Sequence, residues 1–148
     1  INSRIETIND KLLFKESFIK RKCVIPINGY YEWKKNGNQK IPYYIKLDDS
    51  ELIYLAGIWR KEKIDKEKVR VFSIITTNAN SKIKEIHSRM PVILNANEAL
   101  EFIDNQSDKD IINDKINSEE DIDLNFHEVS KYVNNPHNND AKCVEIIN

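Results

Sequence analysis

The sequence is poor in the residues that interrupt a fold and lacks the runs that span a membrane. Its 148 residues include only three glycines and four prolines, and we find no internal repeat or low-complexity linker. No apolar run approaches the roughly 18 residues of a membrane-spanning helix. No charged-then-apolar leader opens the chain. We therefore expect one cytoplasmic domain over residues 1–148, with no membrane partner.

Cysteine is also scarce. Cys23 and Cys143 each lie beside a valine in an apolar stretch. In a chain without a secretory leader, two such thiols are more often buried and reduced than bridged. No CxxC pair and no cluster of histidine and cysteine has the spacing of a zinc site. The sequence therefore predicts neither a metal nor a cofactor.

The charges are balanced in sum but not along the chain. The net charge is −1, yet residues 1–100 carry 19 basic and 12 acidic side chains, whereas residues 101–148 carry 4 basic and 12 acidic ones. A basic body followed by an acidic segment suits a polyanionic ligand on one face. The charge run at 61–68 taken alone is more simply a solvated loop.

The pattern of apolar residues predicts an α+β fold with mostly antiparallel sheet. Segments rich in β-branched and aromatic residues are expected to be strands: 23–27, 30–33, 43–47, 52–59, 69–77 and 126–129. Asn36 and Gly37 form a strong hairpin-turn signal. We expect a loop at 60–68, helices at 12–20, 81–86 and 97–103, and a loop or short helix at 104–123.

Glu32 is a candidate for proton transfer because it lies among aromatic residues. In a strand it shares a face with Tyr30, whereas Tyr31 and Trp33 point the other way. A carboxylate beside aromatic surface is partly removed from water, which favours its protonated form and suits it to acid–base work. The alternative is a solvent-facing glutamate on an edge strand. Trp33 offers a surface on which a base can stack, but it equally suits a core.

Three further candidates follow the strongest predicted strand. Thr76 lies at its end, where hydroxyl and amide side chains either position a ligand or cap the next helix. His87 can shuttle protons near neutral pH, and Arg89 can grip a phosphate with two parallel hydrogen bonds. A histidine in such a setting is also often structural.

These stretches together resemble the SRAP family, the SOS-response-associated peptidases. The resemblance covers nearly the whole chain, in order and spacing. It rests on the segments NSRIET at 2–7, RKCVIP at 21–26, GYYEW at 29–33, LAGIW at 55–59, TTNAN at 76–80, IHSRMPVIL at 86–94 and VSKYVN at 129–134.

The resemblance implies a barrel-like core of sheets and a role in the DNA damage response. Family members bind abasic sites in single-stranded DNA and link to them through an N-terminal cysteine. That cysteine and the strands that follow it would precede Asn2, so we expect this chain to be an N-terminally truncated SRAP domain. Cys23 matches a different family position.

The resemblance also assigns roles to individual residues. Asn2 would hydrogen-bond the linked sugar, and Glu32 and His87 would move protons during ring opening and linkage. Arg4 and Arg89 would hold flanking phosphates, and Thr76 would contact the site.

Two other activities fit the same residues. The chain is a binding module for single strands without any reaction, or a thiol peptidase with Cys23 beside His87 and Glu32 as the orienting acid. The apolar surroundings of Cys23 disfavour a reactive thiolate. If the first strands of the domain are absent, an open sheet edge also favours self-association.

Overall fold

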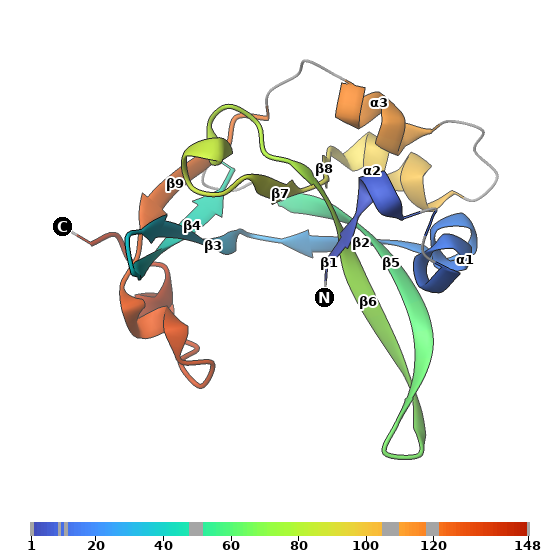
Figure 1. Cartoon of the computed structure of the whole chain (residues 1–148), viewed down its shortest axis with the longest axis horizontal. Coiled ribbons are helices and arrows are strands. Elements are labelled where there is room, and N and C mark those ends of the chain that lie inside the picture. Colours follow the sequence, from blue (N-terminus) through green and yellow to red (C-terminus); the bar gives the residue numbers. More distant parts are fainter. Residues whose placement is uncertain are drawn as a thin grey trace.

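The computed structural model describes residues 2–8, 10, 12–47, 52–104, 110–117 and 122–147. Its larger sheet has six strands, of which four follow the order β1-β6-β5-β2, while β7 pairs with β6 and β8 with β5. The pairs are antiparallel except for β1 with β6 (Figure 1). The strands are β1 (Asn2–Arg4), β2 (Lys22–Ile27), β5 (Ile53–Ile64), β6 (Glu67–Asn78), β7 (Arg89–Pro91) and β8 (Ile93–Leu94).

A second sheet has three strands in the order β3-β4-β9. These are β3 (Tyr30–Asn36), β4 (Gln39–Lys46) and β9 (Asn125–Glu128). The predicted hairpin is confirmed, but its turn lies one residue later, because Asn36 pairs with Gln39. Gly37 takes the positive φ of 58° in this turn, a conformation that costs glycine little.

Short helices flank the sheets, as expected for an α+β fold. Asn95 and Glu98 form a capping box, in which each side chain accepts a hydrogen bond from the other residue's backbone N–H at the start of the second helix. The α-helices are α1 (Leu12–Lys20), α2 (Ala96–Ile103) and α3 (Ile111–Asn117), and the 3₁₀ turns are η1 (Ile5–Thr7), η2 (Ile83–Glu85), η3 (Lys131–Asn134) and η4 (Ala141–Cys143). Part of the interpretation of 104–123 falls outside the described residues.

The larger sheet buries one hydrophobic cluster on each face. Side chains alternate between the faces along a strand. Ala56 and Ile58 therefore pack with Phe102 of α2 in one cluster, while Ile53 and Leu55 of the same strand pack with residues of the second sheet, such as Ile45, in the other. The face away from α2 is the one that the candidate site occupies.

The interpretation of 60–68 as a loop is wrong. β5 and β6 instead continue as a long hairpin that extends away from the sheets (Figure 1). Asp65 and Lys66 form its two-residue turn, with φ values of 48° and 70°, as a type I′ turn requires. The strand signal is hidden because a two-stranded ribbon exposed on both faces carries charges where a core strand carries apolar residues.

Both cysteines are free, and Cys143 is buried as expected, whereas Cys23 is only partly buried. Among the described residues, no helix combines the length and the apolar character needed to cross a bilayer.

Candidate functional site

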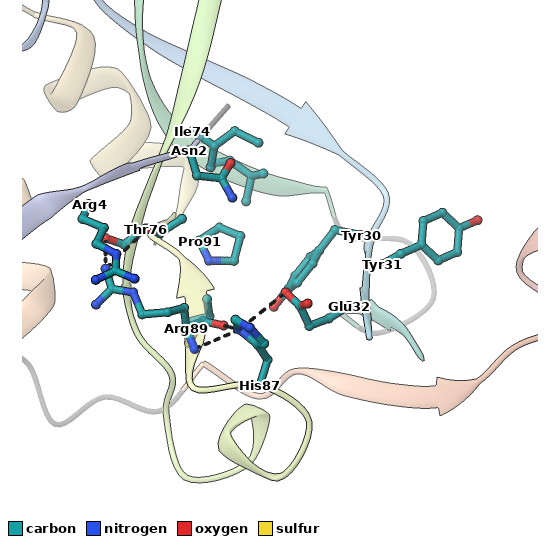
Figure 2. Close-up of a pocket in the computed structure, with 12 residues that line it drawn as sticks. Asn2, Arg4, Tyr30, Tyr31, Glu32, Ile74, Thr76, His87, Arg89 and Pro91 are labelled. Atoms are coloured by element: carbon teal, nitrogen blue, oxygen red, sulfur yellow. Dashed lines mark hydrogen bonds and ion pairs between the residues drawn. The ribbon is translucent and has the colours of Figure 1, made fainter. Parts of the chain in front are cut away.

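Six of the seven residues singled out from the sequence line one cavity of about 370 Å³, on the face of the larger sheet away from α2 (Figure 2). They come from four separate parts of the chain: β1, β3, β6, and the segment that runs from η2 into β7. The six are Asn2, Arg4, Glu32, Thr76, His87 and Arg89.

β1 owes its position to a short parallel pairing with β6. Asn2 pairs with Ile74 and Arg4 with Thr76. Ser3, between them, is buried, and its backbone carbonyl oxygen accepts a hydrogen bond of 3.4 Å from the Thr76 hydroxyl. Because neighbouring side chains on a strand point to opposite faces, burial of Ser3 turns Asn2 and Arg4 toward the cavity.

Glu32 and His87 lie next to each other in the cavity lining (Figure 2). A carboxylate oxygen of Glu32 lies 3.9 Å from Nδ1 of His87, and the two side chains are 26% and 43% exposed. The other oxygen of Glu32 accepts a hydrogen bond of 3.1 Å from the Trp33 backbone N–H. The pair therefore supplies one acid–base group from each of two elements, both reachable from the cavity.

The backbone of Arg89 orients the His87 ring. Its N–H lies 3.2 Å from Nδ1 of His87, in position to donate a hydrogen bond. When Nδ1 accepts that bond, the neutral imidazole carries its proton on Nε2. Protonation of Nδ1 creates a cation beside Glu32. Nδ1 also lies 3.3 Å from the Arg89 carbonyl oxygen, to which it can donate when it carries a proton.

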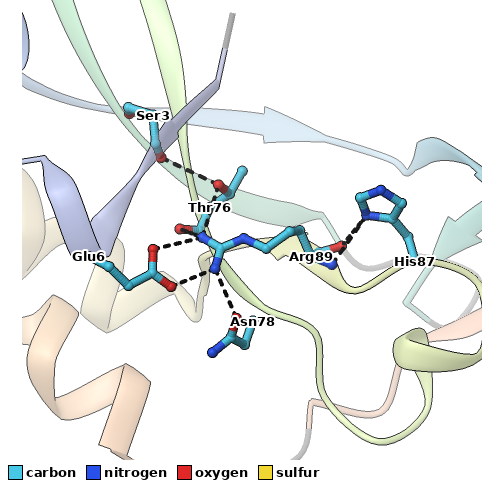
Figure 3. Close-up of polar contacts among 6 residues, drawn as sticks. All are labelled: Ser3, Glu6, Thr76, Asn78, His87 and Arg89. Atoms are coloured by element: carbon cyan, nitrogen blue, oxygen red, sulfur yellow. Dashed lines mark hydrogen bonds and ion pairs between the residues drawn. The ribbon is translucent and has the colours of Figure 1, made fainter.

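The Arg89 guanidinium is held by other side chains of the protein (Figure 3). Both of its terminal nitrogens donate to the Glu6 carboxylate, and one also donates to Oδ1 of Asn78 at 2.9 Å. The other donates to the Thr76 carbonyl oxygen at 2.7 Å. The hydrogen bonds from Arg89 lower the pKa of Glu6. The Arg89 guanidinium, which the sequence suggested as a phosphate ligand, therefore binds the Glu6 carboxylate in this structure.

Arg4 differs from Arg89 in this respect. It lines the same cavity and is exposed. Its side chain makes no hydrogen bond within the described part of the chain, although its charge helps to lower the pKa of Glu6. Arg4 is therefore the cavity's available cation.

Tyr30 also lines the cavity, on the same side as Glu32 (Figure 2). Its hydroxyl is buried and has no hydrogen-bond partner among the described residues. Burial raises the pKa of the phenol, with a further contribution from the Glu32 charge. The sequence predicts that Tyr30 shares a face with Glu32 but does not mark it as a functional residue. The alternation of side chains along β3 is the signal that locates it.

Trp33 is not among the residues that line the cavity. Its indole N–H donates a hydrogen bond of 2.9 Å to Oδ1 of Asn134, and its ring lies 6.4 Å from that of Tyr31. Its contact with DNA remains a prediction about a surface beside the cavity.

Cys23 lies on β2, opposite Gly57 of β5, and is also absent from the cavity lining. Partial burial raises the pKa of its thiol, which lowers the fraction of reactive thiolate. Within the described ranges, no group of three or more histidine, cysteine or acidic side chains has a metal-binding arrangement.

The fold and the cavity define a class: a domain of two curled sheets with a carboxylate–imidazole pair and a free arginine at one cavity. The family model described as "SOS response associated peptidase (SRAP)" matches residues 1–136, so the chain belongs to this family.

Relatives with assigned names agree with this membership. The chain is 34% identical over 148 residues to the abasic site processing protein YoqW of Bacillus subtilis (strain 168), covering 98% of this chain and 66% of that protein. It is 31% identical over 170 residues to the abasic site processing protein HMCES of Xenopus tropicalis, covering 99% of this chain and 50% of that protein. The chain thus spans at most about two thirds of these relatives.

A crystal structure of a protein from Bacteroides thetaiotaomicron superposes with a TM-score of 0.85 at 31% identity. The match covers 99% of this chain and 65% of that one. The likeness confirms the predicted fold class.

Proposed function

We propose that this chain recognises abasic sites in single-stranded DNA, in the cytoplasm. We further propose that, with an N-terminal cysteine ahead of β1, the protein links covalently to the site. The observation that carries the proposal is the convergence of Asn2, Arg4, Glu32 and His87 on one cavity. The names of the relatives support the choice of an abasic site as the ligand.

The linkage chemistry follows from the reactivity of an abasic site. The sugar opens to an aldehyde, which condenses with the α-amine of the cysteine to an imine and releases water. The thiol then adds to the imine carbon, and the nitrogen takes up a proton, which closes a thiazolidine ring without any net oxidation. The α-amine has a pKa of about 7.7–8.0, so a useful fraction is neutral at cellular pH.

Glu32 and His87 would move the protons in these steps. Ring opening needs a proton at the ring oxygen and a base for the hydroxyl, and the loss of water from the first adduct needs an acid. The two groups lie 3.9 Å apart and line the same cavity. Asn2, beside them on β1, would hydrogen-bond the opened sugar.

The phosphates would be held by the arginines. Arg4 has its donors free for a flanking phosphate, whereas Arg89 would have to share its donors with Glu6 or release it. Thr76 would contact the sugar–phosphate at the same position. Trp33 would stack on a base outside the cavity.

A gel assay tests the proposal. The chain is mixed with a single strand that carries one abasic site, beside an intact strand of the same sequence. We expect preferential native binding to the abasic strand and no covalent band on a denaturing gel, because Cys23 and Cys143 are internal residues. A chain extended by an N-terminal cysteine segment from a relative should give the covalent band.

Equal affinity for the abasic and intact strands would contradict abasic-site recognition. It would support the alternative of a general single-strand binding module. A covalent band with the 148-residue chain would show that another amine or thiol reacts. The third alternative, a thiol peptidase using Cys23, lacks support because that thiol lies outside the cavity lining and has a raised pKa.

A further inference from the structure

The hairpin of β5 and β6 carries four of its basic residues on one face. Opposed residues in the antiparallel ladder share a face, and so do alternate residues along each strand. The register places three opposed pairs on one face, here called the ribbon face: Trp59 with Phe72, Lys61 with Arg70, and Lys63 with Lys68.

The ribbon face continues the face that lines the cavity. Leu55 of β5 and Ile74 and Thr76 of β6 line the cavity. They have the same parity along their strands as the residues of the ribbon face, so the same side of each strand lines the cavity and carries the cations. A strand of DNA that leaves the cavity along β6 would therefore meet this face first.

In the charge run at 61–68, basic and acidic side chains point to opposite faces of the hairpin, because alternate residues of a strand do so. The ribbon face has four cations at Lys61, Lys63, Lys68 and Arg70 and no acid. The opposite face carries the acids, with Glu62 in an ion pair with Arg60. A run that alternates in sign along the sequence is therefore basic on one side in space.

This arrangement is unfavourable unless an anion is present. Both charged pairs on the ribbon face place like charges directly opposite each other, which destabilises a ladder. Lys61, Lys63 and Lys68 are exposed and take part in no ion pair within the described part of the chain. A polyanion laid along the face would remove this repulsion.

Aromatic residues lie where the ribbon face joins the cavity. The Arg70 guanidinium carbon lies 5.4 Å from the centre of the Trp59 ring. Phe72, on the neighbouring strand, is 55% exposed. Exposed aromatic rings beside cations are the combination that binds single strands, because bases stack on the rings while the cations hold the phosphates.

We propose that the ribbon face binds the single strand on one side of the abasic site, with Lys61, Lys63 and Lys68 on its phosphates and Phe72 against a base. From Ile74 to Lys68 the face extends about 20 Å at roughly 3.3 Å per residue. The inference rests on the proposed function, since it takes the DNA to lie in the cavity.

The test compares two variants with the same change in charge. K61Q/K63Q/K68Q removes three cations of the ribbon face, and the matched control K15Q/K20Q/K142Q removes three exposed lysines from α1 and η4. Binding is measured by fluorescence anisotropy over a range of salt concentrations. The probes are an abasic strand of about 20 nucleotides, its intact counterpart, a strand of about 5 nucleotides and a probe with duplex flanks.

We expect the ribbon variant to bind the long single strand about tenfold to a hundredfold more weakly at 0.1 M salt, and to reduce the slope of log K against log salt by about 2. The short strand should bind both variants alike. The ratio of abasic to intact affinity should not change, because the cavity is untouched. Glutamine at these exposed positions relieves repulsion, so the melting temperature should not fall.

Equal losses in the two variants would overturn the inference and leave the proposed function intact. An effect seen only with the duplex flanks would overturn the choice of a single strand. If the unaltered chain prefers no abasic strand while the ribbon variant still weakens binding to the intact one, the proposed function fails and the ribbon face stands.

Discussion

Arg89 and Glu6 join two parts of the chain that lie 83 residues apart. Arg89 is 17% exposed and also holds the Thr76 carbonyl, so the ion pair attaches the turn after β1 to the end of β6. It thereby fixes the strand that carries Asn2 and Arg4. Glu6 is thus a positioning residue for the cavity.

This ion pair should make stability depend on pH. The pKa of Glu6 is lowered in the folded protein, chiefly by the Arg89 hydrogen bonds. The contribution is therefore complete above the unfolded pKa of about 4.3 and is lost as pH falls through the folded value. Glu6 is 46% exposed, so we expect at most about 1 kcal/mol.

Urea unfolding of the chain and of E6Q between about pH 7 and pH 3 measures this contribution. The stability difference between them should shrink as the solution becomes acidic. E145Q is the control, because Glu145 is exposed and makes no ion pair among the described residues. A difference between E6Q and the unaltered chain that stays constant with pH would contradict the assignment.

The sequence predicts which single residues line the cavity, but not which side chains those residues contact. The types and order of Glu32, His87 and Thr76 marked them as candidates, and they line one cavity. The sequence around Arg89 does not indicate that its guanidinium donates hydrogen bonds to Glu6. That pairing depends on the parallel contact of β1 with β6, which only the folded chain provides.

The hairpin turn at Asp65 and Lys66 is an element whose sequence does not match its backbone. Both residues have positive φ, and type I′ turns favour glycine at the second position. Lysine there loses about 1–2 kcal/mol to the contact between its Cβ and the backbone. Glycine's greater freedom in the unfolded chain offsets about 0.5–1 kcal/mol of the gain.

K66G should therefore raise the free energy of unfolding by about 0.5 kcal/mol or more. G37A is the matched opposite, because Gly37 has a φ of 58° and open space around it, so alanine meets backbone strain and no neighbour. It should lower stability by about 1 kcal/mol. Chemical unfolding of both variants measures the two effects. A loss in K66G would mean that the Lys66 side chain makes a compensating contact.

The elements that the sequence predicted are those that bury one face. The strand expected at 69–77 lies within β6, and the one expected at 52–59 begins one residue before β5, where β-branched residues pack into the two clusters. The ends of the two strands at 60–64 and 67–68 were missed because neither face is buried there. In such a ribbon the only sequence pattern that indicates a strand is the alternation of lysine with glutamate or valine. A solvated loop can have the same pattern.

On the scale of the whole molecule, the two outer strands of the larger sheet differ in how well they resist pairing. β2 contains Pro26, which lacks the N–H that a further strand would need. β1 has no proline, and among the described residues it pairs only with β6. The net charge of −1 adds little repulsion between copies.

We therefore expect this chain to self-associate through the free side of β1 as its concentration rises. Sedimentation velocity across a range of concentrations should show a growing dimer fraction. Hydrogen exchange should show those amides of β1 that point away from β6 becoming protected in parallel with it. DNA in the cavity should oppose this association, since the same short strand supplies Asn2 and Arg4 to the cavity lining. A monomer at every concentration, with these amides already protected, would mean that the β1 edge is closed within one copy.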